Sequence, residues 1–537
     1  MITIPDYNVV LINTPYSSEY IRYSTNLTYQ EHLGLAYLAS FIKKSNFNVE
    51  IFDCNIQNYS LKDILALMKE KKPDFIGLTA TSHSIKNAIR FSRKFKSYNS
   101  HLCIGGHHAS FAAKEILNES NFDIVVYGEG EITIVELLKA LNNDRKLDMV
   151  NGIYYKENAI KKNPPRDNIN DLDSLPFPDR SIPEYCRDND IQVIINIISS
   201  RGCPYNCSFC DIARFYRLGG KPWRARSAEN FIDELEVITT RFPNFYIQFS
   251  DDNFVGYNRD KSRIYTIANE ILNRGIQVKF DIRCRADSFI IDEDDNLLEL
   301  LKESGLNSIL LGIDGGCDST LELFNKGITE KKNLNMINYL RSKDIVLQMG
   351  YIMFHPYLTI FSLKKQLDFF IKSKQTLYSQ MTNRLEIYPG IDLIDDLERA
   401  GFLVDQDHKN IYPYKYMDEN VKIVAENLTK IQAKMDKFDG LIQHLELIEP
   451  DMKNLSKIND LKDIIHKIYR EKNEIVNVYY DLFNFSILLV KKGWKSKKFT
   501  EYTNSCIQIL EEKYKSINNL INKVKIFFNK SRGIHLL

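Results

Sequence analysis

Two successive runs of alternating apolar and amphipathic segments constrain what this chain can fold into. In the first run, residues 1 to about 142, short apolar segments typical of strands alternate with segments that carry apolar residues at helical spacing. The expected strands are Val9–Ile12, Val49–Phe52, Phe75–Leu78, Leu102–Gly105 and Ile124–Tyr127. The expected helices are Glu31–Lys44, Leu61–Lys69, Ser84–Ser97, Phe111–Asn118 and Glu131–Leu141. This alternation predicts an α/β domain with a doubly wound, Rossmann-like parallel sheet covered by helices on both faces.

The second run extends from Ile191 to about Ile394 and contains about six strand–helix units. Its expected strands are Ile191–Ile198, Phe245–Phe249, Gln277–Ile282, Ser308–Ile313, Ile345–Phe354 and Arg384–Ile387. Six units cannot close the eight-stranded TIM barrel. The sequence therefore predicts a partial (βα)6 TIM-type barrel with an open edge.

The segments outside these runs set the expected domain boundaries. A hairpin-like stretch, Gly152–Asn158, and a proline-rich linker, Pro164–Asp179, separate the two runs. The tail carries the apolar spacing of amphipathic helices in Ala425–Ile448 and Tyr502–Phe528, without a sustained heptad register. We expect a helical C-terminal domain that covers the open barrel edge, with a coiled-coil interaction module as the alternative. The predicted domains are residues 1–145, 146–190, 191–400 and 401–537.

Charge and composition exclude several classes of protein. The chain has 71 basic and 70 acidic residues among 537, a balance that gives no sign of a nucleic-acid or membrane-surface partner. Its apolar stretches fall short of the roughly 20 residues that span a bilayer. Met1–Asp6 lack the basic and apolar regions of a signal peptide, and the nine cysteines do not form a disulfide framework. We therefore expect a cytoplasmic protein.

Three of the cysteines, Cys203, Cys207 and Cys210, form a CxxxCxxC run. The run follows the expected strand Ile191–Ile198 and contains Gly202 and Pro204, so the cysteines are expected on a loop at the carboxyl end of a strand. Three thiolates on an iron–sulfur cluster leave one iron open to a small molecule, whereas simple electron carriers use four. The alternative is a structural zinc site that a distant histidine completes.

This loop resembles the signature of the radical S-adenosylmethionine (radical SAM) enzymes, including the aromatic Phe209 between the second and third cysteines. The resemblance implies a 4Fe–4S cluster whose open iron binds S-adenosylmethionine, with Phe209 near the adenine. It also implies that Ser250 and Asp251 receive the methionine amino group, that Arg285 binds its carboxylate and that Asp314 lies near the ribose. Each of these polar residues follows an expected strand, and surface salt bridges are the alternative for the charged ones.

Small residues also follow the strands of the first run. Thr79-Ala80-Thr81 and Gly105-Gly106 lie 26 residues apart and would let a large flat group approach the sheet edge without side-chain obstruction. With Gly105–Ser110 and Gly128–Glu131, these loops resemble the cobalamin-binding fold. The cobalamin contacts that this resemblance implies are Thr79, Thr81, Gly105, Gly106, His107, Gly128 and Glu129.

The first loop lacks the DxHxxG motif that supplies cobalt with an axial histidine in many cobalamin proteins. The same absence occurs in the cobalamin-dependent branch of radical SAM enzymes, so it leaves cobalamin in place but its lower face without an assigned ligand. His83, His107 and His108 are candidates by residue type, and ordinary hydrogen-bonded histidines are the alternative. Farther along, His355 and Tyr351 at the fifth barrel strand are candidate catalytic residues, or else packing residues.

The combined resemblance implies a cobalamin-dependent radical SAM methyltransferase that uses a 5′-deoxyadenosyl radical to methylate an unactivated carbon. The expected partners are a small-molecule or peptide substrate and an external electron donor such as flavodoxin or ferredoxin. The first alternative keeps both cofactors but catalyses cyclisation, ring rearrangement or oxidation without methyl transfer. The second is a cobalamin- or redox-sensing binding protein with a regulatory cluster.

Overall fold

The computed structural model describes residues 7–16, 29–257, 261–404, 410–449, 452, 455–456 and 459–532. The chain divides into two compact units. The first comprises Met1–Ile313, Leu323–Gly350 and Glu386–Pro413, and the second comprises Asp314–Glu322, Tyr351–Leu385 and Tyr414–Leu537. The expected internal domain boundaries near residues 145, 190 and 400 stay predictions. The outer limits, residues 1 and 537, and the segment Met1–Asp6 lie outside the described residues.

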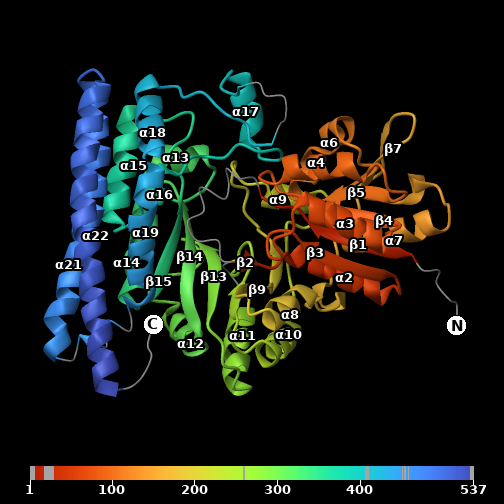
Figure 1. Ribbon diagram of the computed structural model, residues 1–537, viewed down its shortest axis with the longest axis horizontal. Helices are drawn as coiled ribbons and strands as arrows, with labels where there is room; N and C mark the ends of the chain where they lie inside the picture. Colours follow the sequence, from red (N-terminus) through yellow and green to blue (C-terminus); the bar gives the residue numbers. More distant parts are fainter. Residues whose placement is uncertain are drawn as a thin grey trace. The chain divides into compact units, whose positions relative to one another are not determined.

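The first unit contains a seven-stranded sheet in the order β3-β1-β4-β5-β6-β7-β8 (Figure 1). Its strands are β1 (Asn8–Asn13), β3 (Asn48–Asp53), β4 (Phe75–Thr79), β5 (His101–Gly105), β6 (Ile124–Val126), β7 (Ile153–Lys156) and β8 (Ile160–Lys162). The pairs from β3 to β6 are parallel, and β7 and β8 add the expected hairpin in antiparallel pairing. The doubly wound sheet predicted from the sequence is confirmed.

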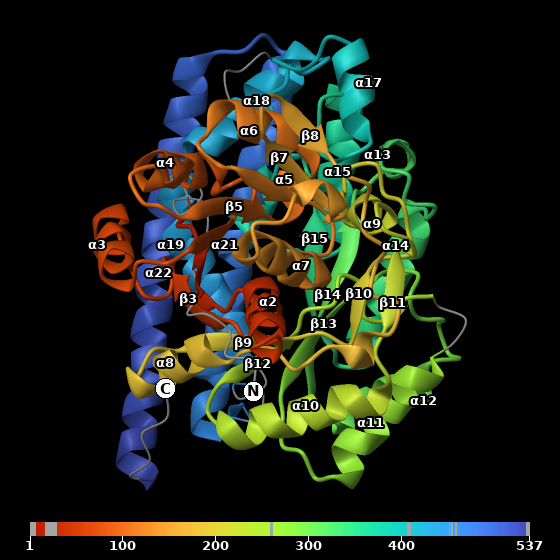
Figure 2. The same cartoon turned by 90° about the vertical axis from the view of Figure 1, so that its right-hand side faces the viewer.

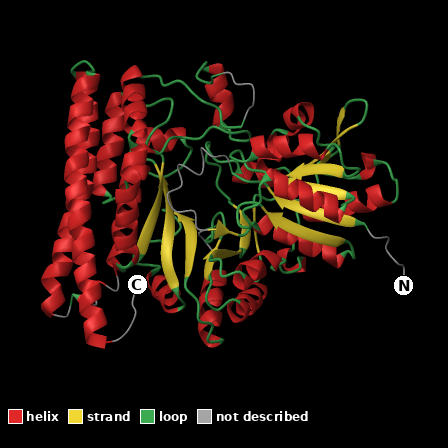
Figure 3. Ribbon diagram, in the orientation of Figure 1, coloured by secondary structure: helices red, strands yellow, loops and turns green. Residues whose placement is uncertain are grey.

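Helices cover both faces of this sheet, as Figure 3 shows. They are α2 (Leu33–Lys44), α3 (Leu61–Lys71), α4 (Ile85–Phe95), α5 (His107–Phe111), α6 (Ala113–Glu119) and α7 (Glu131–Asn142). Alternate residues of β1 enter different cores: Val10 and Ile12 pack with the helices α3, α4 and α6, whereas Val9 and Leu11 pack with α2 and α7. The expected helix Phe111–Asn118 forms instead as two short helices, because Ala112 leaves the helical region at φ −120°.

A second sheet has six strands in the order β15-β14-β13-β12-β9-β2 and curls into a half-barrel (Figure 2). Its strands are β2 (Tyr29–Gln30), β9 (Val193–Ile197), β12 (Tyr246–Phe249), β13 (Phe280–Arg285), β14 (Leu306–Asp314) and β15 (Val346–Tyr351). The pairs from β2 to β14 are parallel. A short antiparallel hairpin, β10 (Ser200–Gly202) and β11 (Trp223–Ala225), follows β9.

The sixth strand of this sheet differs from the sequence prediction. Arg384–Ile387 form two isolated bridges, Phe354↔Arg384 and Ile387↔Tyr412, rather than a strand. Pro389, two residues after Ile387, has no N–H to continue a ladder. The sixth position is taken by β2, which forms the other edge of the sheet and pairs with β9.

The helices and short 3-10 turns between residues 147 and 399 are η1 (Leu147–Met149), η2 (Leu172–Ser174), α8 (Ser181–Asp188), α9 (Ile212–Arg217), α10 (Ala228–Arg241), α11 (Ser262–Asn273), α12 (Asp295–Glu303), α13 (Asp318–Leu323), α14 (Glu330–Ser342), α15 (Ile360–Lys372), α16 (Tyr378–Thr382) and α17 (Leu393–Arg399). Several begin at a side-chain cap. The Ser227 hydroxyl, for example, accepts a hydrogen bond from the Asn230 N–H at the start of α10.

The tail is helical, as its apolar spacing predicts. It forms α18 (Glu419–Lys430), α19 (Gln432–Leu447), α21 (Asn459–Lys491) and α22 (Ser496–Arg532), all within the second unit. Gly493, at φ +81°, lies in the turn between the two long helices. A position of this domain over the barrel edge stays a prediction. Among the described residues, no helix combines the length and the apolar character that crossing a bilayer requires.

Candidate cofactor site

The first unit encloses a cavity of about 310 Å³. One part of its wall comes from the loops that follow β4, β5 and β6: Thr79, Gly105, Gly106, His107, Gly128, Glu129. Another part comes from the half-barrel, after β9 and β12 and from α9: Ser200, Arg201, Phe215, Tyr216, Ser250, Asp252. The cavity thus brings together the two sets of post-strand loops that the sequence analysis singled out separately.

Part of the cavity extends between the seven-stranded sheet and two of its helices. Leu11, Cys103 and Val126 line it from the strands, while Leu38 of α2 and Ile134 of α7 line it from the helices that cover the same face. These apolar walls fit a flat aromatic group. The loop residues named above add hydroxyl, carboxylate and imidazole groups to the wall. The cavity therefore suits a large ligand with an apolar tail and a polar body.

The glycines of the wall keep the cavity open. Gly106 and Gly128 adopt φ values of +104° and +74°, which side chains disfavour, and a Cβ on Gly128 would meet no atom within 4 Å. Thr79 lines the cavity, whereas Thr81 is exposed and is not part of the wall. Six of the seven residues expected to contact cobalamin therefore lie on one surface. The cradle that these glycines form fits such a cofactor.

His107 begins α5 and is the candidate axial histidine that lines the cavity. Its ring stacks on Phe215 with centroids 4.0 Å apart, and Nδ1 lies 3.2 Å from a carboxylate oxygen of Asp211. Burial alone would lower the pKa of His107, but the hydrogen bond and charge of Asp211 outweigh burial and raise it. The other two candidates point elsewhere. His108 Nδ1 lies 2.9 Å from the Ser82 hydroxyl, and His83 Nε2 lies 3.1 Å from Glu386.

His32 also lines the cavity, although the sequence analysis did not consider it. It caps α2, because its Nδ1 accepts a hydrogen bond from the Leu35 N–H at 3.2 Å. A neutral imidazole that accepts at Nδ1 carries its proton on Nε2, which lies 3.4 Å from the Thr79 hydroxyl. Burial lowers the pKa of His32 and favours this neutral form. His32 is therefore a hydrogen-bond donor at the cavity wall.

The three cysteines lie on the loop between β10 and α9, each half-buried. Gly202, just before them, needs its φ of +85°, and a Cβ there would lie 2.0 Å from the Pro222 carbonyl oxygen. Burial raises the pKa of Cys203 and of Cys210. Two side chains donate to the sulfurs: Asn253 Nδ2 lies 3.8 Å from Cys203 Sγ, and Arg285 Nη1 lies 3.5 Å from Cys207 Sγ.

The three cysteines fit an iron–sulfur cluster, because three thiolates on one loop can bind three irons and leave the fourth open to a small molecule. A structural zinc site usually takes four protein ligands. Hydrogen bonds to the sulfurs are a feature of cluster sites, because they tune the reduction potential.

The residues expected to hold S-adenosylmethionine differ in their contacts within the structure. Phe209 packs against Phe324, with ring centroids 4.8 Å apart, and Ser250 lines the cavity. Asp251 is fully buried, where its carboxylate accepts from the Ser199 N–H at 3.1 Å and from the Ser199 hydroxyl at 2.8 Å. Its neighbour Asp252 lines the cavity and was passed over in the sequence analysis. A contact between Asp251 and the amino group of S-adenosylmethionine stays a prediction.

Arg285 is held on several sides. Its Nε and Nη2 donate to the Asp287 carboxylate at 2.8 and 3.0 Å, and its guanidinium lies 3.9 Å from the Tyr205 ring centroid. It is therefore fixed beside Cys207, and a role toward a ligand carboxylate stays a prediction. Asp314 ends β14 with φ +60° and belongs to the second unit. Its expected proximity to a ribose is likewise a prediction.

The two candidate catalytic residues are buried in the second unit. His355 Nε2 lies 3.0 Å from the Thr320 hydroxyl, and the Tyr351 hydroxyl lies within 2.9 Å of the Gln366 oxygens. Burial lowers the pKa of His355 to about 3, so the imidazole is neutral. Neither residue lines the cavity of the first unit. Their contacts match the packing alternative, and a catalytic role stays a prediction.

Comparisons with known proteins agree with the two sources of the cavity wall, the seven-stranded sheet and the half-barrel. Residues 25–138 match the family model of the B12 binding domain, and residues 197–369 match that of the radical SAM superfamily. An uncharacterized methyltransferase from Pyrococcus horikoshii is 30% identical over 410 residues, which cover 75% of this chain and 86% of that protein.

Two further comparisons give the range of the relatives. The anaerobic magnesium-protoporphyrin IX monomethyl ester cyclase of Rubrivivax gelatinosus is 28% identical over 59% of this chain, and the match spans only 58% of the cyclase. Among solved structures, the cobalamin-dependent S-adenosylmethionine radical enzyme OxsB with aqua-cobalamin bound superposes with a TM-score of 0.73 at 21% identity. That match covers 98% of this chain and 81% of OxsB and shows a common fold.

Proposed function

Because the chain belongs to the cobalamin-dependent radical SAM family, we propose that it transfers a methyl group from methylcobalamin to an unactivated carbon. The proposed substrate is a small molecule or a peptide. The reaction requires a reductant, for which we propose a flavodoxin or a ferredoxin. When bound, the cluster with S-adenosylmethionine supplies a 5′-deoxyadenosyl radical, and the cobalamin supplies the methyl group.

The observation that carries the proposal is the shared wall of one cavity. Thr79, Gly105 and Gly128 reach it from the B12 binding domain, while Ser200 and Asp252 reach it from the half-barrel that holds the cysteine loop. Methyl transfer to a substrate radical requires the methyl donor and the radical source to approach one carbon. A cavity built from both sets of loops supports this arrangement.

The residues of the chain would position and shield the reactants rather than take part in bond making. The glycine loops would admit the cofactor, and the apolar wall of Leu11, Leu38 and Ile134 would take its tail. Asn253 and Arg285 would donate hydrogen bonds to the cluster thiolates. The buried setting of the cavity would keep water away from radicals.

The second candidate is a reaction without methyl transfer, such as ring formation or oxidation. The similarity to the Rubrivivax cyclase supports it, because the match to that relative covers 59% of this chain. The longer match to the Pyrococcus methyltransferase, which covers 86% of that protein, favours methyl transfer.

One experiment separates the two. The protein is reconstituted without oxygen with iron, sulfide and hydroxocobalamin, reduced, and supplied with S-adenosylmethionine that carries a trideuterated methyl group. A methyltransferase must reload its cobalamin, so trideuterated methylcobalamin and S-adenosylhomocysteine should form. If 5′-deoxyadenosine forms but methylcobalamin does not, the methyltransferase proposal is wrong and the second candidate stands. Bound cobalamin with neither product would indicate a sensor.

A further inference from the structure

Four buried charged residues join the cobalamin side of the cavity to the cysteine side. Arg201 Nη1 donates to Glu129 at 2.9 Å, and Arg201 Nη2 donates to Glu131 at 2.6 Å. Arg224 donates to both carboxylate oxygens of Glu129 at 2.9 Å. The side chains of Glu129, Glu131, Arg201 and Arg224 retain only 4–8% of their surface exposed. We call these four residues the ion-pair bridge.

The bridge connects two loops that serve different cofactors. Glu129 directly follows the cavity glycine Gly128, whereas Arg201 lies two residues before Cys203. Arg201 and Arg224 face each other in the antiparallel β10–β11 hairpin, so both arms of the hairpin hold the same carboxylate. Glu129 also accepts from the Ile169 N–H at 2.8 Å. The hairpin that leads into the cysteine loop is thus fastened to the glycine loop.

The bridge leaves little freedom for one loop to move without the other. Its two carboxylates and two guanidiniums balance in charge, and moving either loop alone would leave a buried charge without its partner. Aromatic rings fix the guanidiniums as well: Arg201 lies 4.9 Å from the Tyr37 ring centroid, and Arg224 lies 5.3 Å from that of Tyr216. Both tyrosines line the cavity. A ligand pressing on this wall therefore also presses on the hairpin.

We propose that the ion-pair bridge couples occupancy of the cobalamin cavity to the geometry of the cysteine loop. The inference rests on the proposed function, because it takes cobalamin and the cluster as the ligands of the two loops. Its residues act as positioning residues. The consequence is thermodynamic: a loaded cluster should change the affinity for cobalamin, and bound cobalamin should change the cluster environment by the same coupling.

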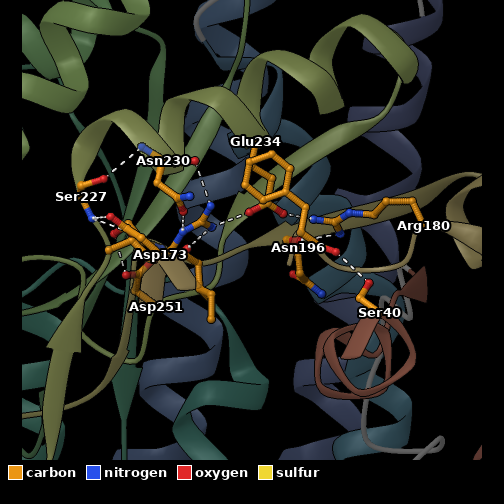
Figure 4. A network of polar contacts seen from close by, with 12 residues as sticks. Ser40, Asp173, Arg180, Asn196, Ser227, Asn230, Glu234 and Asp251 are labelled. Atoms are coloured by element: carbon orange, nitrogen blue, oxygen red, sulfur yellow. Dashed lines mark hydrogen bonds and ion pairs between the residues drawn. The ribbon is translucent and has the colours of Figure 1, made fainter. Parts of the chain in front are cut away.

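A second buried ion-pair network in the same unit provides a control (Figure 4). There Glu234 of α10 accepts from Arg180 at 2.6 Å and from Arg226, and Arg226 also donates to Asn230. Glu234, Arg180 and Arg226 are as buried as the bridge residues. None of them lines the cavity. Loss of an ion pair there should disturb packing without touching the link between the two loops.

The test compares Arg224→Lys with Arg226→Lys. Both variants replace a buried guanidinium by an ammonium group, the two positions are two residues apart in the sequence, and neither arginine lines the cavity. Dissociation constants for hydroxocobalamin are measured without oxygen by spectroscopic titration, for wild-type protein and both variants, each with and without the reconstituted cluster. The ratio of the two dissociation constants gives the coupling factor of each protein.

We expect a coupling factor of about tenfold for the wild type, within the usual range of allosteric coupling. Arg226→Lys should retain that factor, and Arg224→Lys should reduce it to about twofold or less. A wild-type factor of one, an unchanged factor in Arg224→Lys, or an equal loss in Arg226→Lys would overturn the inference. If Arg224→Lys does not fold, Glu131→Gln removes one ion pair of the bridge and takes its place.

A second measurement does not depend on affinity. Wild-type protein loaded with hydroxocobalamin and then reduced with excess dithionite holds cob(II)alamin; its electron paramagnetic resonance (EPR) g-values for the reduced cluster should differ from those of cobalamin-free protein, and Arg224→Lys should lose this difference. Failure of this coupling is distinguishable from failure of the proposed function. A wild type that binds both cofactors independently contradicts only the bridge, whereas a wild type that binds no cobalamin contradicts both.

Discussion

Gly105 offers a way to close the cavity without straining the backbone. Unlike Gly106 and Gly128, it lies outside the left-handed φ region. A Cβ at Gly105 would meet the Val126 carbonyl oxygen at 3.5 Å and the Val126 Cβ at 3.7 Å, which are ordinary contacts. Val126 itself lines the cavity, so a longer side chain at position 105 would extend along the same wall.

The change we consider is Gly105→Leu, which adds four carbons beside a cavity of about 310 Å³. Overfilling a packed site costs about 1–3 kcal/mol. If that cost falls on the bound state alone, the dissociation constant for cobalamin should rise by about 5- to 150-fold. The free protein should unfold at nearly the wild-type temperature, because without ligand the added side chain occupies open space.

The assay is equilibrium dialysis with hydroxocobalamin, together with thermal unfolding of the free protein. Thr81→Leu is the matched control, because Thr81 is exposed and is not part of the wall. It should bind like the wild type. Cobalamin binding by Gly105→Leu within twofold of the wild type would refute the assignment of this cavity. Weaker binding by both variants would indicate that the threonine loop makes contacts that the cavity wall does not include.

Three further predictions concern the cluster and the second unit. Replacing Cys203, Cys207 and Cys210 together with Ala should abolish the broad iron–sulfur absorbance and 5′-deoxyadenosine formation, and a full cluster in this variant would contradict the assignment. Arg285→Lys should lower the reduction potential of the cluster, measured by EPR titration, because Arg285 donates a hydrogen bond to a cluster thiolate. An unchanged potential with a raised KM for S-adenosylmethionine would instead support a contact between Arg285 and the carboxylate of S-adenosylmethionine. Burial lowers the pKa of His355 to about 3, whereas an unfolded imidazole titrates near 6.5. As pH falls from 7 to 5, the unfolded chain binds a proton at this imidazole and the folded chain does not. The free energy of unfolding, measured by urea titration, should therefore fall by about 2 kcal/mol more in the wild type than in His355→Gln. An equal change of the free energy of unfolding with pH in the two proteins would contradict this.

Most of the fold could be predicted from the sequence, because the sheet strands are apolar and the helices amphipathic. The exceptions are informative. Tyr29–Gln30 form β2 with only two residues and no apolar run, so its place at the edge of the half-barrel depends on pairing with β9. Arg384–Ile387 carry a strand-like pattern, yet tertiary contacts reduce them to isolated bridges. Pattern alone does not determine which edge of a sheet receives its last strand.

The residues of the candidate site likewise fall into those that the sequence could predict and those that it could not. The cysteines and the glycine loops could be predicted, because their spacing follows from the chemistry of the ligands they serve. His32 was missed, since histidine is an uncommon helix cap and a single one carries no pattern. The choice between Asp251 and Asp252 also required coordinates, because adjacent residues point in different directions. Likewise, no sequence pattern states that Glu129 pairs with Arg201 and Arg224.

We propose that cobalamin binds in the cavity and that the cluster forms beside it, on the cysteine loop, whose three cysteines do not themselves line the cavity. Arg201 lines it and lies two residues before Cys203, so the chain between them spans at most about 7 Å. EPR spectroscopy of protein that holds both cob(II)alamin and the reduced cluster measures their proximity directly. We expect spin–spin splitting or faster relaxation of the cobalt signal compared with the variant in which Cys203, Cys207 and Cys210 are replaced by Ala. A cobalt signal identical in the two proteins would contradict this proposal.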